Sequence, residues 1–98
     1  EGLLAHAAKM GDYFKAELAK AFAGNPGVKE IRGQGLMIGI ELTKPCGELV
    51  KQCADNGLLL SVTADTVIRL VPALITTQAE IDEIIAILTP LVRKLLAQ

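Results

Sequence analysis

The 98-residue chain is predicted to be a single α+β domain, with a small, mostly antiparallel sheet of three or four strands covered by helices on one face. Apolar residues recur every three or four positions near both ends of the chain, which is typical of amphipathic helices. Between these ends they alternate in short runs, which is typical of strands. The resulting order, α-β-β-α-β-β-α, joins strands through short connections and single helices, as α+β folds do.

The first half of the chain predicts a helix followed by two strands. The helix is expected over residues 3–23 and ends at the run Gly24–Gly27, because Gly and Asn form left-handed caps and Pro cannot continue a helix. A short extended piece over 28–32 precedes a strand over 36–42, whose alternate residues are apolar. The connection over 33–35 does not match a simple two-residue hairpin, so a hairpin and a bulged, bent pair both remain open.

The second half predicts a helix, two strands and a final helix. The first of these helices starts at Pro45, ends at Asn56-Gly57 and carries Cys46, Leu49, Val50 and Cys53 on one side. The apolar run 58–62 predicts a strand covered on both faces, and a polar loop over 61–66 leads into a strand over 67–71.

The last helix is expected to begin with a capping box formed by Thr77 and Glu80. Its apolar stripe is wide enough to face a core. Pro90 lies inside the stripe and lacks a backbone N–H, so it should kink or split the helix near Thr89.

The composition excludes two classes of partner. Ten basic and eleven acidic residues give a formal charge of -1 and no basic surface for nucleic acid or an acidic membrane. No apolar run reaches the ~20 residues that span a bilayer, and no secretory signal is present at the start. We therefore expect no nucleic-acid or membrane partner and a cytoplasmic location.

The apolar fraction of 51% has two explanations: a compact Ala- and Leu-rich domain, or a domain with one face packed against more protein. The chain also begins at Glu1, inside what looks like a helix already under way, so a piece of a longer protein is expected. Cys46 and Cys53 would lie roughly 10 Å apart on one helix, beyond the ~7 Å limit of a disulfide. They are expected to be reduced thiols.

The residues that usually carry catalysis are scarce. His6 is the only histidine and is expected to be an exposed or partly packed side chain on the first helix. Cysteine and histidine spacings typical of metal sites are absent. Gly33, Gly35 and Gly39 do not form a dinucleotide fingerprint, because a strand follows where a helix should. No catalytic, metal or cofactor-binding residue is therefore assigned to this chain.

Arg69 is the one residue whose surroundings are unusual, since it lies within the run Val-Ile-Arg-Leu-Val-Pro. A guanidinium is costly to bury unless an anion receives it. Two structural explanations are open: a salt bridge to Glu41 or another acid, or an edge strand from which Arg69 reaches water. The functional alternative is a binding site for a carboxylate, which the five-donor fork of arginine suits.

Three parts of the sequence resemble one enzyme family. The segments VKEIRGQGLMIGIEL (28–42) and GLLLSVTADTVIRLVPALITT (57–77), with the closing helix, are similar to the C-terminal small domain of class III, fold-type I aminotransferases, which use pyridoxal phosphate. Within the class, these segments are most similar to the branch that acts on acetylornithine in arginine biosynthesis. The same segments distinguish this branch less well from the succinylornithine, ornithine and 4-aminobutyrate branches. The family commonly has Pro-Pro where this chain has Pro72-Ala73.

The resemblance implies that Arg69 takes the place of the arginine that holds the substrate's α-carboxylate. It also implies that residues 1–98 form a single C-terminal domain whose partners are its own large domain, a second subunit in a homodimer, and amino-acid and oxoacid substrates. The cofactor lysine and the phosphate-binding loop belong to that large domain, so the isolated chain is expected to be inactive. A hypothesis of another class is a stand-alone, non-catalytic α+β ligand-binding module.

Overall fold

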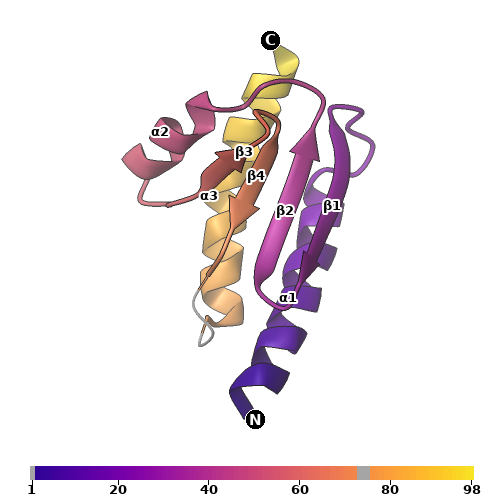
Figure 1. The fold of residues 1–98 in the computed structure, drawn as a ribbon, viewed down its shortest axis with the longest axis vertical. Coiled ribbons are helices and arrows are strands. Elements are labelled where there is room, and N and C mark those ends of the chain that lie inside the picture. Colours follow the sequence, from indigo (N-terminus) through magenta and orange to yellow (C-terminus); the bar gives the residue numbers. More distant parts are fainter. Residues whose placement is uncertain (1, 73–75) are drawn as a thin grey trace.

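The computed structural model describes residues 2–72 and 76–98, and its elements follow the predicted α-β-β-α-β-β-α order (Figure 1). The elements are α1 (Gly2–Ala21), β1 (Val28–Gln34), β2 (Met37–Leu42), α2 (Glu48–Asp55), β3 (Ser61–Thr63), β4 (Val67–Leu70) and α3 (Gln78–Ala97). Ala73, where the chain departs from the family's Pro-Pro pair, and Glu1 lie outside the described residues.

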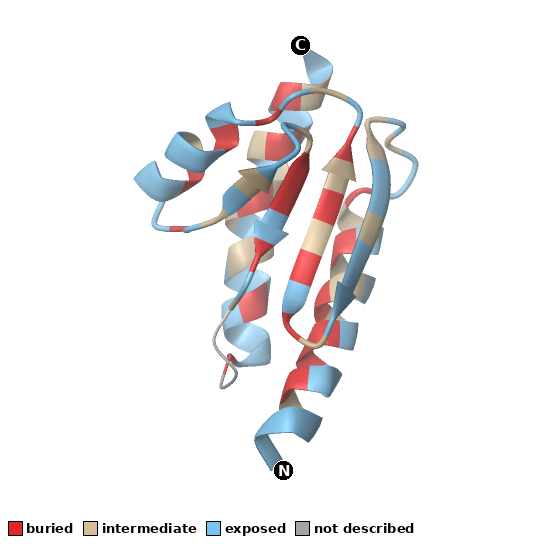
Figure 2. Cartoon of the chain, in the orientation of Figure 1, coloured by how far each residue is buried: buried red, intermediate tan, exposed pale blue. Residues whose placement is uncertain are grey.

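The four strands form one antiparallel sheet in the order β1-β2-β4-β3. Both long helices, α1 and α3, lie behind this sheet in Figure 1, so they cover one of its faces. Alternate residues of the two central strands point towards them and are buried: Ile38, Ile40, Leu42, Ile68 and Leu70. Figure 2 shows this alternation along β2. The predicted fold class and the placing of the helices are confirmed.

The hairpin between β1 and β2 corrects the prediction for residues 33–35. β1 extends through Gln34, which pairs with Met37, so only Gly35 and Leu36 form the turn. Gly35 has a φ of 58° and Leu36 is not in the left-handed region, which is the pattern of a type II′ turn with Gly first. The connection is therefore a two-residue hairpin. The sequence did not predict this turn because Leu36 continues the alternation of apolar residues in the following strand.

The hairpin turn packs directly on α1. A Cβ atom added to Gly11 would lie 1.9 Å from the carbonyl oxygen of Gly35, so only glycine permits this approach. Gly11 costs the helix about 1 kcal/mol relative to alanine. The close contact between α1 and the sheet accounts for its presence there.

The strand predicted over 58–62 is wrong in position and in burial. β3 is Ser61–Thr63, it lies at an edge of the sheet, and Leu59 is 84% exposed. The predicted polar loop shrinks to a turn over 64–66, in which Ala64 and Asp65 take positive φ values. A run of apolar residues cannot by itself reveal that one of them faces solvent.

The second helix is shorter than predicted. α2 begins at Glu48, so Cys46 precedes it and the assumption that both cysteines share a helix is wrong. Both thiols are nonetheless free and fully buried, and burial raises the pKa of each. Val50, predicted on the buried side of this helix, is 40% exposed.

The capping box of α3 is confirmed. The Glu80 amide donates to Thr77 Oγ1 at 3.2 Å, and the Thr77 amide donates to Glu80 Oε1 at 2.9 Å. Pro90 lies inside a helix that continues from Gln78 to Ala97, so the helix is not split. The Oγ1 atom of neighbouring Thr89 is buried and has no hydrogen-bond partner among the described residues.

Candidate functional site

Arg69 lies on the central strand β4, and its side chain projects from the face of the sheet opposite the helices. Strand register places it in one row with three residues of other strands, because Gly39 pairs with both Arg32 and Arg69, and Arg69 pairs with Ser61. Its neighbours along the strand, Ile68 and Leu70, point into the core while Arg69 is exposed. We call this the outer face of the sheet; it is the side that Figure 1 views.

Neither structural explanation for Arg69 holds as predicted. The carboxylate of Glu41 accepts from Arg32 Nη1 at 3.0 Å and lies 3.6 Å from Lys29 Nζ, so it is engaged by other cations. β4 is an interior strand, although the Arg69 side chain does reach solvent. Across residues 2–72 and 76–98, no hydrogen bond or ion pair engages Arg69. Its donors are thus available to a ligand.

The outer face is hollowed beside Arg69. The hollow has a volume of about 500 Å³, and β1, β2, β3 and β4 all contribute to its lining. Arg32 and Arg69 stand on either side of Gly39, and the exposed side chains of Met37 and Val71 add apolar surface. A charged group beside apolar surface is the arrangement that binds a small carboxylic acid with a carbon chain.

Arg32 differs from Arg69 because its guanidinium forms ion pairs with carboxylates on the same face of the sheet. Arg32 Nη1 lies 3.0 Å from both Glu30 Oε1 and Glu41 Oε1. The hydrogen bond from Arg32 and the charge of Lys29 lower the pKa of Glu41, and the hydrogen bond to Glu41 raises the pKa of Arg32. The hollow therefore has one guanidinium that is already neutralised and one that is not.

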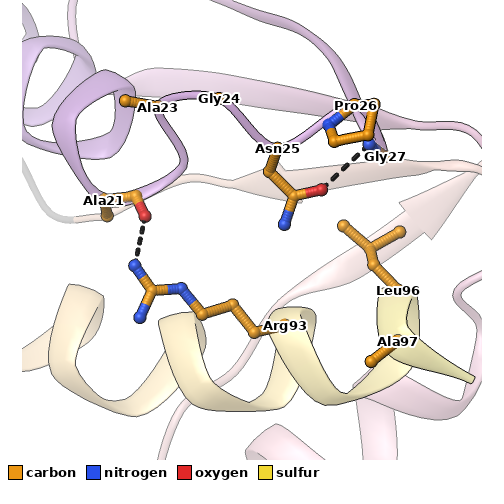
Figure 3. Close-up of a pocket in the computed structure, with 9 residues that line it drawn as sticks. All are labelled: Ala21, Ala23, Gly24, Asn25, Pro26, Gly27, Arg93, Leu96 and Ala97. Atoms are coloured by element: carbon orange, nitrogen blue, oxygen red, sulfur yellow. Dashed lines mark hydrogen bonds between the residues drawn. The ribbon is translucent and has the colours of Figure 1, made fainter.

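The third arginine, Arg93, lines a separate hollow of about 490 Å³ between the loop 24–27 and the end of α3 (Figure 3). Arg93 Nη2 donates to the carbonyl oxygen of Ala21 at 2.5 Å, and Asn25 Oδ1 accepts from the Gly27 amide at 2.9 Å. Arg93 thus ties α3 to the C-terminal end of α1, where carbonyl groups lack helical partners. Sequence patterns did not predict this hollow, and the Gly-Asn-Pro-Gly loop was the one signal at its location.

The remaining predicted candidates do not gather near Arg69. His6 is partly buried, and its Nε2 lies 2.7 Å from the carbonyl oxygen of Thr76, as expected of a packed side chain. Within the described ranges, no three His, Cys, Asp or Glu side chains are placed to hold a metal ion. In the same residues, no helix is long and apolar enough to cross a bilayer.

The lysines of the described residues do not gather at the hollow beside Arg69. The hollow beside Arg69 is lined by no lysine among the described residues. Lys44 donates to the carbonyl oxygens of Leu95 and Gln98, and Lys15 donates to that of Gly33. Among the described residues, no lysine therefore faces a molecule that would occupy this hollow.

Over the part of the chain that the structure describes, the sheet presents Arg69 without a partner, whereas Arg32 and Arg93 are engaged. Comparison with known proteins identifies the class of protein. The sequence profile described as "Aminotransferase class-III" matches residues 1–92. The chain belongs to the class III aminotransferase family, whose members depend on pyridoxal phosphate.

The chain is similar to curated acetylornithine aminotransferases. It is 50% identical over all 98 residues to acetylornithine aminotransferase 1 of Bordetella bronchiseptica, covering 100% of this chain and 25% of that protein. It is 42% identical over 88 residues to the acetylornithine aminotransferase of Methanosarcina acetivorans, covering 90% of this chain and 22% of the relative. The chain thus spans about a quarter of the length of these relatives.

Solved structures share the fold. Ornithine aminotransferase from Plasmodium yoelii superposes with a TM-score of 0.88 at 28% identity, covering 95% of this chain and 26% of that one. Acetylornithine aminotransferase from Elizabethkingia anophelis gives a TM-score of 0.82 at 26% identity, covering 91% of this chain and 24% of that one.

Proposed function

We propose that the chain is the C-terminal small domain of an aminotransferase that moves an amino group between N-acetylornithine and 2-oxoglutarate in arginine biosynthesis. The 50% identity to an acetylornithine aminotransferase over the whole chain supports the reaction. The single observation that carries the domain's role is Arg69, a guanidinium without an intramolecular partner among the described residues, at the edge of a hollow.

In this proposal Arg69 binds the α-carboxylate of the amino acid and of the oxoacid. Two parallel N–H donors of the guanidinium meet the two carboxylate oxygens, which fixes the orientation as well as the position of the substrate. Both substrates carry an α-carboxylate, so one arginine serves both halves of the reaction. Holding the substrate in one orientation removes much of the entropic barrier to the chemical step.

The cofactor lies outside this domain in the proposal. Pyridoxal phosphate supplies the electron sink for amino-group transfer when it is bound. Because the described residues offer no lysine beside the hollow, the remainder of the longer protein would hold it. This domain would then pack on its own large domain within a cytoplasmic homodimer, and would be inactive alone.

A second candidate is another class III aminotransferase, and one observation favours keeping it. The chain is 44% identical over 82 residues to ornithine aminotransferase 2 of Staphylococcus saprophyticus. Arg69 would act in the same way there, because the α-carboxylate is common to these substrates. A stand-alone, non-catalytic ligand-binding module is the remaining alternative.

The test uses the full-length protein with its cofactor. Arg69→Ala should lower kcat/KM for both the amino acid and the oxoacid about a hundredfold, through KM, since two charge-assisted hydrogen bonds are lost. Arg69→Lys should recover only part of the loss because an ammonium cannot form the paired contact. Cofactor absorbance should not change.

Arg93→Ala is the matched control, because this arginine contacts the Ala21 carbonyl and lies in the other hollow. It should leave KM unchanged. Normal substrate affinity in Arg69→Ala would refute the assignment. The parent gene offers a second check: if it encodes no large domain with a cofactor lysine ahead of Glu1, the non-catalytic module is favoured.

A further inference from the structure

Nothing in the described residues 2–72 and 76–98 requires glycine at position 39. It lies in the interior of β2, where glycine destabilises a strand relative to alanine. Its φ is not in the left-handed region, in contrast to that of Gly35. Among the described residues, the three atoms nearest to a Cβ atom at Gly39 all belong to Arg32 and lie at ordinary contact distances, with Cγ at 3.7 Å and Nε at 3.8 Å.

Gly33, on the neighbouring strand, shows what a structural glycine looks like in the same sheet. A Cβ atom there would lie 2.3 Å from the carbonyl oxygen of Met37, so the hairpin excludes any larger residue. Gly39 would accept a methyl group without a clash. A side chain at Gly39 would extend into the hollow beside Arg69.

The position of Gly39 in the hollow is specific. Its strand partners on the two sides are Arg32 and Arg69, so it forms the floor between the two guanidinium groups. Arg32 is held by Glu30 and Glu41, whereas Arg69 has no ion-pair partner among the described residues and could draw a carboxylate to this place. Glycine in a strand interior often marks a site where a ligand approaches the backbone closely.

We propose that Gly39 is a binding residue of the Arg69 hollow, where its missing side chain leaves room for the carbon chain of an α-amino acid or α-oxoacid. This inference rests on the proposed function of Arg69. The substrate's carboxylate contacts Arg69, and the carbons next to it lie over the Gly39 backbone. A side chain at this position takes the space of those carbons.

The experiment measures binding and folding together in the full-length protein with its cofactor. The probe is glutarate, a dicarboxylate with no carbonyl to react, and its Kd is measured by calorimetry. Gly39→Ala should weaken binding about tenfold and Gly39→Val about a hundredfold, the range expected when carbon atoms are added to a filled site. The melting temperature of both variants should equal or exceed that of the wild type, because each new residue favours the strand.

Gly33→Ala is the control for a structural glycine, and it should lower the melting temperature. Unchanged glutarate binding in both Gly39 variants would overturn the inference. So would a fall in melting temperature as large as that of Gly33→Ala, because it would mean that another part of the protein packs on Gly39.

Arg69→Ala separates the two proposals. If it abolishes glutarate binding while the Gly39 variants bind normally, only the role of Gly39 fails. If Arg69→Ala binds glutarate as the wild type does, the proposed function fails, and the role of Gly39 fails with it.

Discussion

The two faces of the sheet are made from the same strands and have opposite properties. The inner face carries Ile40, Ile68 and Leu70, each no more than 2% exposed, against the long helices. The outer face carries Arg69 and the Arg32–Glu41 pair, all in contact with solvent. Successive residues of a strand point to opposite faces, so a step of one residue along the strand leads from one face to the other. Stability and the carboxylate binding proposed for Arg69 would therefore depend on neighbouring residues of one strand, and substitutions should separate them.

The largest effect is expected from Ile68→Ala. Truncating this fully buried side chain should lower the free energy of unfolding by about 4 kcal/mol, because contacts are lost and a cavity remains. Arg69→Ala, one residue away, should change it by less than about 0.5 kcal/mol, as surface substitutions do. Urea denaturation of both variants measures the difference. Equal losses would show that the two faces are not independent.

A smaller effect is expected where α1 touches the hairpin. Gly11→Ala should destabilise the chain by about 2 kcal/mol, because its Cβ cannot fit against the Gly35 carbonyl and α1 must move. Gly2→Ala is the matched control, since the same change in the same helix meets no atom within 4 Å. It should leave the melting temperature unchanged or slightly higher. A neutral Gly11→Ala would mean that α1 is not held tightly to the inner face.

The smallest effect is expected on the outer face at Glu41. The hydrogen bond from Arg32 and the charge of Lys29 hold the pKa of Glu41 below its ordinary value of 4.5. A lowered pKa stabilises the fold above the ordinary value, and this contribution is lost as pH falls through the folded-state pKa. The melting temperature of Glu41→Gln should thus lie below that of the wild type at about pH 6 and approach it at about pH 3. A gap that widens on acidification would contradict the ion pair.

Much of the fold could be predicted from the sequence because periodicity reports which side of an element is apolar. The order of elements, the one-sided cover of helices and the capping box at Thr77 all follow from such local patterns. The errors lie where burial depends on distant neighbours. Leu59 is apolar and exposed, and only the edge position of β3 explains why a strand covered on both faces does not form there.

For the site, chemistry singled out Arg69 and resemblance suggested its role. What sequence could not decide was which arginine pairs with Glu41. That choice depends on the register of β1 against β2, which the Gly35-Leu36 turn and an irregularity near Lys29 set together. The space above Gly39 could not be predicted from the sequence either. A glycine that leaves room for a ligand and a glycine that avoids a steric clash have the same letter in a sequence.

The interior position of β4 also affects the entropy of binding. Arg69 is paired with β2 on one side and β3 on the other, so its backbone torsions are already restricted before any ligand arrives. Binding then has to order only the side-chain torsions, at a cost of about 2 kcal/mol. An arginine on a loop would lose a further ~1–2 kcal/mol for every backbone residue that becomes fixed. In the proposed function, the strand thus holds a flexible side chain on a rigid support, which lowers the entropic cost of binding a carboxylate.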